Sequence, residues 1–240
     1  MGEDIHRREF LRKAAVGSIG SIALVSIPAL GTALAAPVSA KKDDDDDDGA
    51  DRVRWDIISL DHAPPNATIS PGGVSFATAP THAAPPLDLL RIKFTGTGTF
   101  VARSGGGGSG RVTGGGTWET FNPAGASSAS GTYRVKRLVS WQFANLQAQT
   151  PLFIDNIGDT NERANGHAIL VIKYSDGSRG ILGVLCHGPG APAGIHEGVV
   201  ATKGFVTYVN SEGPTSPFTD KNRTIFHVRQ RDDDDDDDDD

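Results

Sequence analysis

Residues 90–100 read Leu-Arg-Ile-Lys-Phe-Thr-Gly-Thr-Gly-Thr-Phe. Apolar side chains and glycines occupy the even positions, whereas charged and hydroxylated side chains occupy the odd positions. Because successive side chains of a strand point to opposite faces, this period of two predicts a strand with one buried face. Strands of this kind are typical of antiparallel sheets.

The same alternation recurs from residue 132 to residue 143, where Arg137 interrupts the apolar face and predicts a bulge, a barrel end or a polar cavity. Residues 168–174 and 180–186 are apolar on both faces. Asp176-Gly177 lies between them, and Asp-Gly is typical of the tight turn of a hairpin.

No stretch has a convincing helical period. Including the segments above, roughly nine strands are expected. A sheet of that many strands must close or fold over on itself. We predict an all-β fold, an antiparallel barrel of roughly eight to nine strands, with a two-sheet β-sandwich or jelly roll as the alternative. The remaining expected strands lie at about 53–60, 74–78, 111–121, 199–209 and 223–228.

The first forty residues have the order of a signal peptide: basic residues, then a long apolar stretch, then small residues. Arg7 and Arg8, followed by Phe10, Leu11 and a further basic residue, resemble the twin-arginine consensus. This resemblance implies recognition by the twin-arginine export machinery, which carries folded proteins.

Two small-residue sites suit cleavage, after Ala40 or alternatively after Ala35, and Ala40 is preferred because Lys41-Lys42 then opens a polar chain. Either cleavage removes the only hydrophobic span and leaves no stable membrane span. An uncleaved amino-terminal anchor is the alternative. The expected location is therefore exported: periplasm, cell wall or medium.

The rest of the chain is expected to form a single β-domain, residues 52–231, between an acidic linker at 41–51 and a poly-Asp tail at 232–240. Residues 49–231 carry 17 Lys and Arg against 12 Asp and Glu, so the acidity belongs to the aspartate runs. We expect both runs to be disordered, to favour solubility and to contact divalent cations weakly. A third role is to cover basic patches of the domain.

The segment from Cys186 to Glu197 concentrates reactive side chains. His187, His196 and Glu197 are candidate metal ligands, and a Cys-His pair is a candidate thiolate nucleophile. The alternative is a buried Cys beside histidines at the ends of a loop, because the spacing fits no established zinc motif. Cys186 is the only cysteine, so an intramolecular disulfide is excluded. The sequence singles out no catalytic residue.

Other polar and aromatic residues point to less specific roles. Trp55, Trp118 and Trp141 belong to alternating strands and are expected in the core, with sugar stacking as the alternative. The stretch 155–166 is interpreted as a solvated turn rather than a calcium loop. No dense basic run is interleaved with aromatic residues, so nucleic-acid binding is not expected.

Two resemblances concern the domain itself. Residues 111–118 and 130–133 are similar to glycine-rich β-domains exported by bacteria, whose role is undefined. Residues 194–199 resemble a segment of the antiparallel barrels of allene oxide cyclases and dirigent proteins. The leading hypothesis is a non-enzymatic domain that binds a small-molecule ligand or an envelope component. The alternatives are a small β-barrel enzyme, either isomerase-like or cyclase-like or a metal-assisted hydrolase, and a carbohydrate-binding module.

Overall fold

The computed structural model describes residues 51–63, 65–80, 89–102, 111–149, 153–213 and 219–229. The predicted signal peptide and both aspartate runs lie outside these ranges. No helix within them is long and apolar enough to cross a membrane. The elements are β1 (Asp51–Asp61), β2 (Ala67–Pro71), β3 (Ser75–Pro80), β4 (Leu89–Phe94), β5 (Thr97–Ala102), β6 (Gly115–Phe121), β7 (Ser127–Leu146), β8 (Phe153–Asp155), the 3-10 helix η1 (Thr160–Glu162), β9 (Arg163–Tyr174), β10 (Arg179–Cys186), β11 (Gly198–Lys203), β12 (Val206–Tyr208), β13 (Asn210–Ser211) and β14 (Thr219–Arg229).

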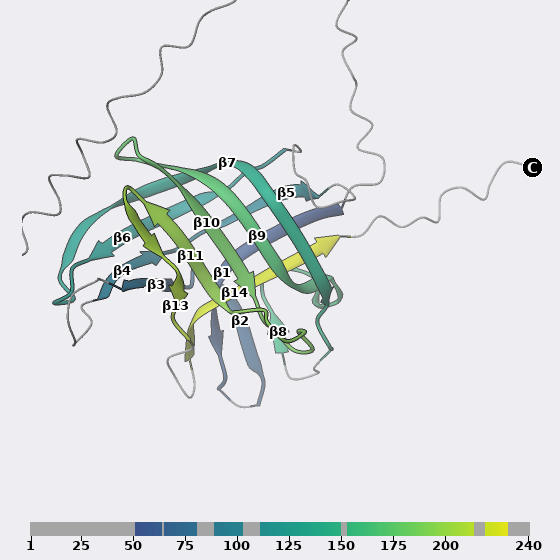
Figure 1. Cartoon of the computed structure of the whole chain (residues 1–240). Helices are drawn as coiled ribbons and strands as arrows, with labels where there is room; N and C mark the ends of the chain where they lie inside the picture. The colour runs from purple at the N-terminus through teal and green to yellow at the C-terminus, as the bar shows by residue number, and fades with distance from the viewer. Residues whose placement is uncertain are drawn as a thin grey trace, which may run out of the picture. The chain divides into compact units, whose positions relative to one another are not determined.

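Six strands close into an antiparallel ring in the order β1, β5, β6, β7, β9 and β14 (Figure 1). The first and last strands of the domain are neighbours in it, since β1 pairs with β14 along most of its length. Strand β9 completes the ring by pairing with β14 at Ala164 and Arg163. The predicted all-β antiparallel barrel is confirmed.

The other strands extend this ring outward. Strands β10, β11 and β12 continue the sheet from β9, and β4, β3 and β13 continue it from β6. The stretch that was expected to be one strand, residues 90–100, is divided at Thr95–Gly96 into β4 and β5. This division lets β4 pair with β3 while β5 pairs with β1.

Two local predictions in the barrel strands are confirmed. A register shift between Val135 and Arg137 places a bulge in β7, where the apolar alternation is interrupted. The hairpin of β9 and β10 turns at Asp176-Gly177, and Gly177 has a φ of 90°, a conformation that favours glycine.

Glycines allow β5 and β6 to approach closely. A Cβ at Gly98 would lie 2.4 Å from the carbonyl oxygen of Thr113 and 2.7 Å from Nε1 of Trp55. Gly114 has a φ of +121° and faces the same contact. Any larger residue at either position would push these strands apart and move Trp55 out of the core.

The main core consists of aromatic and aliphatic side chains on the inner faces of the ring and its extensions. The ring of Trp141 lies 4.6 Å from that of Phe226 and 5.4 Å from that of Phe100, both in edge-on arrangements that favour aromatic packing. The three tryptophans, at positions 55, 118 and 141, are all part of this cluster, as the alternation predicted.

A second, smaller core lies on the other face of β1. Ile58 and Leu60 pack there with Ile69 of β2 and Ile225 of β14. A register shift between Ile58 and Leu60 bends β1 at this point, and β2 folds back against it. The short strand β8 pairs with β2 in parallel and adds Phe153. None of β2, β8 and β13 was expected from the sequence, because each is too short to show a period.

Candidate functional site

A pocket of about 290 Å³ opens beside this second core, and we call it the Glu197 pocket. Its volume is close to the lower end for small-molecule sites, which combine apolar walls with a few polar groups. The apolar part of the lining is Ile58, Leu60, Ile69, Phe153, Pro189 and Ile225, and the polar part is His62, Gln147, Arg163, His187, Glu197, Arg223 and Thr224, with Gly188 between them.

Glu197 is held at the pocket by the loop that follows β10. Glycines at positions 190 and 194 turn this loop with φ values of 80° and 93°, so that the chain returns to β11 beside β14. The carboxylate of Glu197 then accepts hydrogen bonds from the backbone N–H groups of His187, at 2.5 Å, and Thr224, at 2.6 Å.

Burial raises the pKa of Glu197 to about 7, although the two backbone N–H groups and nearby Arg223 favour the ionised form. The hydroxyl of Thr224 stabilises the ionised form of Glu197 only weakly. It donates to the carbonyl of Leu185 at 2.6 Å and lies 3.4 Å from the Glu197 carboxylate. Glu197 therefore changes its charge near neutral pH, which is a property of groups that bind or transfer protons.

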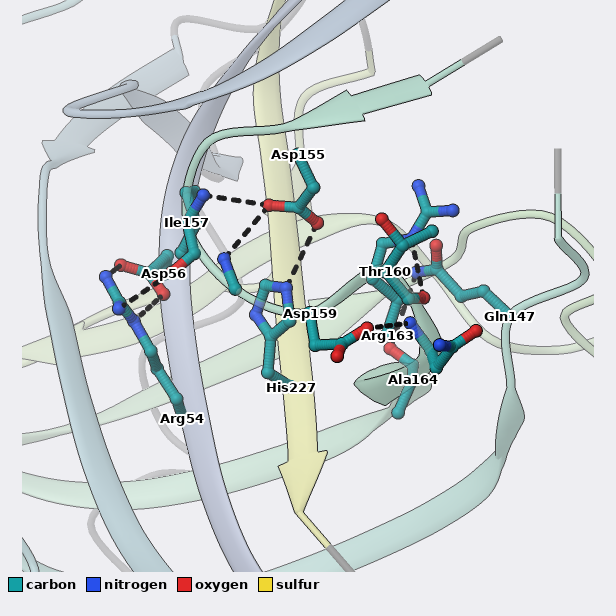
Figure 2. A network of polar contacts seen from close by, with 12 residues as sticks. Arg54, Asp56, Gln147, Asp155, Ile157, Asp159, Thr160, Arg163, Ala164 and His227 are labelled. Carbon is teal, nitrogen blue, oxygen red and sulfur yellow. Dashed lines mark hydrogen bonds and ion pairs between the residues drawn. The ribbon is translucent and has the colours of Figure 1, made fainter. Parts of the chain in front are cut away.

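Arg163 supplies a positive charge to the same pocket. Its Nε donates to the carbonyl of Thr160 at 3.2 Å (Figure 2). Its guanidinium lies 5.5 Å from the ring centre of Phe153. The side chain is buried, and Nη2 has no hydrogen-bond partner among the described residues. A buried donor without a partner is costly, so an anionic ligand group at Nη2 would be stabilising.

Two further polar residues of the pocket lining, His62 and Arg223, are both bound by Asp220. This buried carboxylate binds Nε2 of His62 at 2.8 Å and Nη2 of Arg223 at 2.9 Å. Both partners are thereby fixed in orientation at the pocket edge.

The structure brings together only part of the predicted metal set. His187 and Glu197 line one pocket, whereas His196 is exposed and is not part of its lining. No group of three or more His, Cys, Asp and Glu side chains in the described ranges is arranged to hold a metal ion. The geometry therefore gives the metal hypothesis no support.

Cys186 lies inside the main core and accepts a hydrogen bond from Nε2 of Gln147 at 3.4 Å. Burial raises the pKa of its thiol well above the ordinary value, and the charge of Glu197 adds to this effect. The thiol is therefore protonated at neutral pH, which matches the interpretation as a buried cysteine rather than a thiolate nucleophile.

A polar network supports the region next to the pocket (Figure 2). Asp155 accepts hydrogen bonds from the backbone of Ile157 and Gly158 and from Nε2 of His227, at 2.9, 3.2 and 3.1 Å. Burial alone would raise the pKa of Asp155, but these hydrogen bonds outweigh it and hold the pKa below its ordinary value. The sequence interpretation of 155–166 as a solvated turn is thus wrong for Asp155, whose side chain is buried.

Arg54 ties this network to the barrel. Its guanidinium binds Asp56 through two hydrogen bonds and donates to the carbonyl of Ile157 at 3.1 Å (Figure 2). The pKa of Arg54 is raised, first by the hydrogen bond to Asp56, whose side chain is buried. The segment after β8 is therefore held against the outer face of β1.

Sequence reasoning found Glu197 and His187 but missed Arg163, His62 and the Asp220–Arg223 pair. These residues lie on four separate segments that only the closed ring brings together. One signal was present: an arginine at the start of an otherwise apolar strand pattern, at Arg163, is unusual because buried charges are rare.

The tryptophans do not form a sugar platform. Trp55, Trp118 and Trp141 are 0%, 2% and 5% exposed, so none presents a flat ring face to solvent. This burial counts against the carbohydrate-binding alternative.

Comparison of the chain with known protein families, with curated proteins and with solved structures finds no significant match.

Proposed function

We propose that this protein is an exported, non-enzymatic β-barrel domain that binds a small ligand in the Glu197 pocket, and that the ligand is mostly apolar with one anionic group. The observation that carries the proposal is the buried guanidinium of Arg163: the residue lines a pocket with apolar walls, and its Nη2 lacks a partner among the described residues. A carboxylate or similar group would satisfy it.

The size of the pocket limits the ligand. At about 30 Å³ for each non-hydrogen atom, the volume of water in the liquid, a pocket of 290 Å³ holds roughly ten atoms. The apolar part would lie against Ile58, Leu60 and Ile69, and the anionic group would lie between Arg163 and the protonated form of Glu197.

The test compares three probes of one length by calorimetry: octanoate, 1-octanol and octylamine. Octanoate is expected to bind the protein, and the Arg163→Met variant is expected to bind it about ten-fold more weakly, as the loss of one charge-assisted hydrogen bond implies. The change to Met keeps the volume, and replacing a buried charge by an apolar side chain seldom unfolds a protein. Binding of 1-octanol should hardly change in this variant.

The pH adds an independent check, because octanoate should bind more tightly at pH 6 than at pH 8. At the higher pH the ionised Glu197 repels the carboxylate of the ligand. Equal binding of octanoate and octylamine, or equal binding by the Arg163→Met variant, would refute the proposal.

A second candidate function is proton transfer at a carbon next to a carbonyl group, and the pKa of Glu197 near 7 favours it. Exchange of the α-protons of 2-octanone with deuterated water, followed by NMR, tests this candidate. Faster exchange with the protein, lost in Glu197→Gln, would support an isomerase-like enzyme. Exchange at the rate in buffer would exclude it for this class of ketone.

Outside the barrel, the proposal assigns residues 1–40 to twin-arginine export and the aspartate runs to solubility with weak contacts to divalent cations. The resemblance at Arg7, Arg8, Phe10 and Leu11 supports the first assignment. The absence of apolar side chains in the runs supports the second.

A further inference from the structure

A second hollow, of about 550 Å³, lies on the outer face of the barrel, and we call it the arginine groove. Arg52, Arg54, Arg111 and Arg229 line it, together with Asp159 and Glu162. It runs between the outward face of β1 and β14 and the segment that follows β8, which Figure 2 shows in front of β14. This groove is separate from the Glu197 pocket and plays no part in the proposed function.

Strand register places like charges next to one another in the groove. Arg52 of β1 lies directly opposite Arg229 of β14, and Arg54 lies opposite His227. Val53 and Trp55, which alternate with Arg52 and Arg54 along β1, belong to the main core, so the arginines face outward. Like charges directly opposite across two strands destabilise a sheet unless a counter-charge is present.

Counter-charges within the barrel are incomplete. Arg54 has Asp56, and Arg229 lies 3.2 Å from Glu162. No acidic side chain of the described ranges lies within ion-pair distance of Arg52 or Arg111. The groove thus keeps at least two cationic groups for an external carboxylate or phosphate.

Both acidic runs of the chain join the barrel at this groove. Strand β14 ends at Arg229, and the run Asp232–Asp240 begins three residues later. Strand β1 begins at Asp51, and the run Asp43–Asp48 ends three residues earlier. Three residues span at most about 10 Å, so the nearest aspartate of each run, Asp48 or Asp232, is within reach of Arg52 and Arg229.

We propose that the arginine groove binds a carboxylate-rich chain and that its occupant is the protein's own run Asp232–Asp240. The run supplies nine carboxylates next to a groove that lacks counter-charges, and Arg229 itself lines the groove. A tether this short keeps the run at an effective concentration on the order of 1 mM, which favours it over free anions. The bound run then shields the cationic face of the domain from other polyanions.

The test uses the full chain with Asp232–Asp240 changed to Asn, and a fluorescein-labelled peptide of nine aspartates as the probe. Fluorescence anisotropy at low salt measures binding. The neutralised chain is expected to bind the peptide, and the intact chain is expected to bind it at least about ten-fold more weakly because its own run competes. Binding should decrease steeply as salt is added.

Two pairs of substitutions in the neutralised chain locate the site. Arg52→Gln with Arg111→Gln should weaken peptide binding about ten-fold, because both residues line the groove. Arg134→Gln with Lys173→Gln is the matched control: these exposed cations also lie opposite each other, on β7 and β9, outside the groove lining. The control should change binding by less than about two-fold. All four side chains are exposed, and a thermal melt of each variant verifies its fold.

Several results would overturn the proposal. Equal binding by the intact and neutralised chains would show that the run leaves the groove open, and equal losses in the two pairs would show unspecific attraction. If only neutralising Asp43–Asp48 allowed binding, the other run would be the occupant. If the blocking depended on protein concentration, the run of a second copy would be the occupant.

Discussion

Glu197 is the residue whose ionisation the fold perturbs most clearly toward neutral pH. Its pKa rises from 4.5 unfolded to about 7 folded, so between these values the folded state binds more protons than the unfolded state. Stability therefore decreases as pH rises from 4.5 to 7 and then levels off, and the total loss is about 3 kcal/mol at 1.36 kcal/mol for each pH unit. Burial of the Glu197 carboxyl thus lowers stability above neutral pH.

Urea unfolding at pH 5, 6, 7 and 8 measures this dependence. The free energy of unfolding of the native chain should fall across the series, whereas that of Glu197→Gln should have a much smaller slope, because its amide does not ionise. The comparison concerns slopes, so an equal offset at every pH leaves it intact. Parallel slopes in the two proteins would assign the dependence to other groups.

Gly158 shows how tightly the polar network is packed. A Cβ at this position would lie 2.5 Å from Cδ2 of His227, whose ring is buried. Gly158→Ala should therefore cost about 1 to 3 kcal/mol through displacement of the His227 ring and its hydrogen bond to Asp155. Gly213→Ala is the control, because a Cβ there meets nothing within 4 Å. Thermal unfolding compares the two, and equal stabilities would contradict the close contact.

At the residue scale, the sequence could predict only what neighbouring positions reveal. His187 and Glu197 were found because they flank one loop, and Gly177 because its turn type requires a positive φ. Asp155 was assigned to solvent because its neighbours are polar, yet its partner His227 lies 72 positions away. A sequence pattern around Asp155 cannot reveal a hydrogen-bond partner so far away along the chain.

At the scale of elements, the hairpin of β1 and β2 forms the wall between the second core and the Glu197 pocket. Ile69→Ala should cost about 2 to 5 kcal/mol, since Ile69 is buried in that core. It should also weaken octanoate binding because it removes part of the apolar wall. The near-UV circular dichroism of the tryptophans should be unchanged, since all three lie in the main core.

Ile92→Ala is the matched control, with the same change made in the main core. It should lower stability by a similar amount but leave octanoate affinity nearly unaltered in the folded protein, because Ile92 does not line the pocket. If both variants lost affinity equally, the pocket would depend on the whole barrel rather than on the hairpin.

Long strands were predictable from their alternation, and short ones were not. The pattern located β7, β9 and β10, where many residues repeat the same period. It missed β2 and β8, of five and three residues: β2 pairs with β1 next to the register shift of β1, and β8 pairs only with β2 among the described strands. These two strands carry Ile69 and Phe153, so two of the missed elements contribute to the apolar wall of the pocket.

For the whole molecule, ring closure joins the two ends of the domain, since β1 pairs with β14 over more than 150 intervening residues. The alternation predicted a barrel but could not predict this neighbour relation, which depends on the register of every strand between. A ring of this topology closes only after β14 has been synthesised. Export of an already folded protein is compatible with that order of events, and twin-arginine export is of this kind.

Changing Arg7 and Arg8 to Lys should therefore hold the protein inside the cell while leaving the barrel folded, because lysine keeps the charge but not the arginine pair. Fractionation of cells that express the native chain and the variant measures location, and limited proteolysis of the retained variant measures folding. A resistant fragment that includes β1 and β14 is expected. As the control, Arg12→Lys changes a basic residue outside the pair and should leave export nearly unchanged. Undiminished export of the Arg7→Lys, Arg8→Lys variant would refute the assignment to this route, and a retained chain that proteases degrade completely would show that the barrel does not close before export.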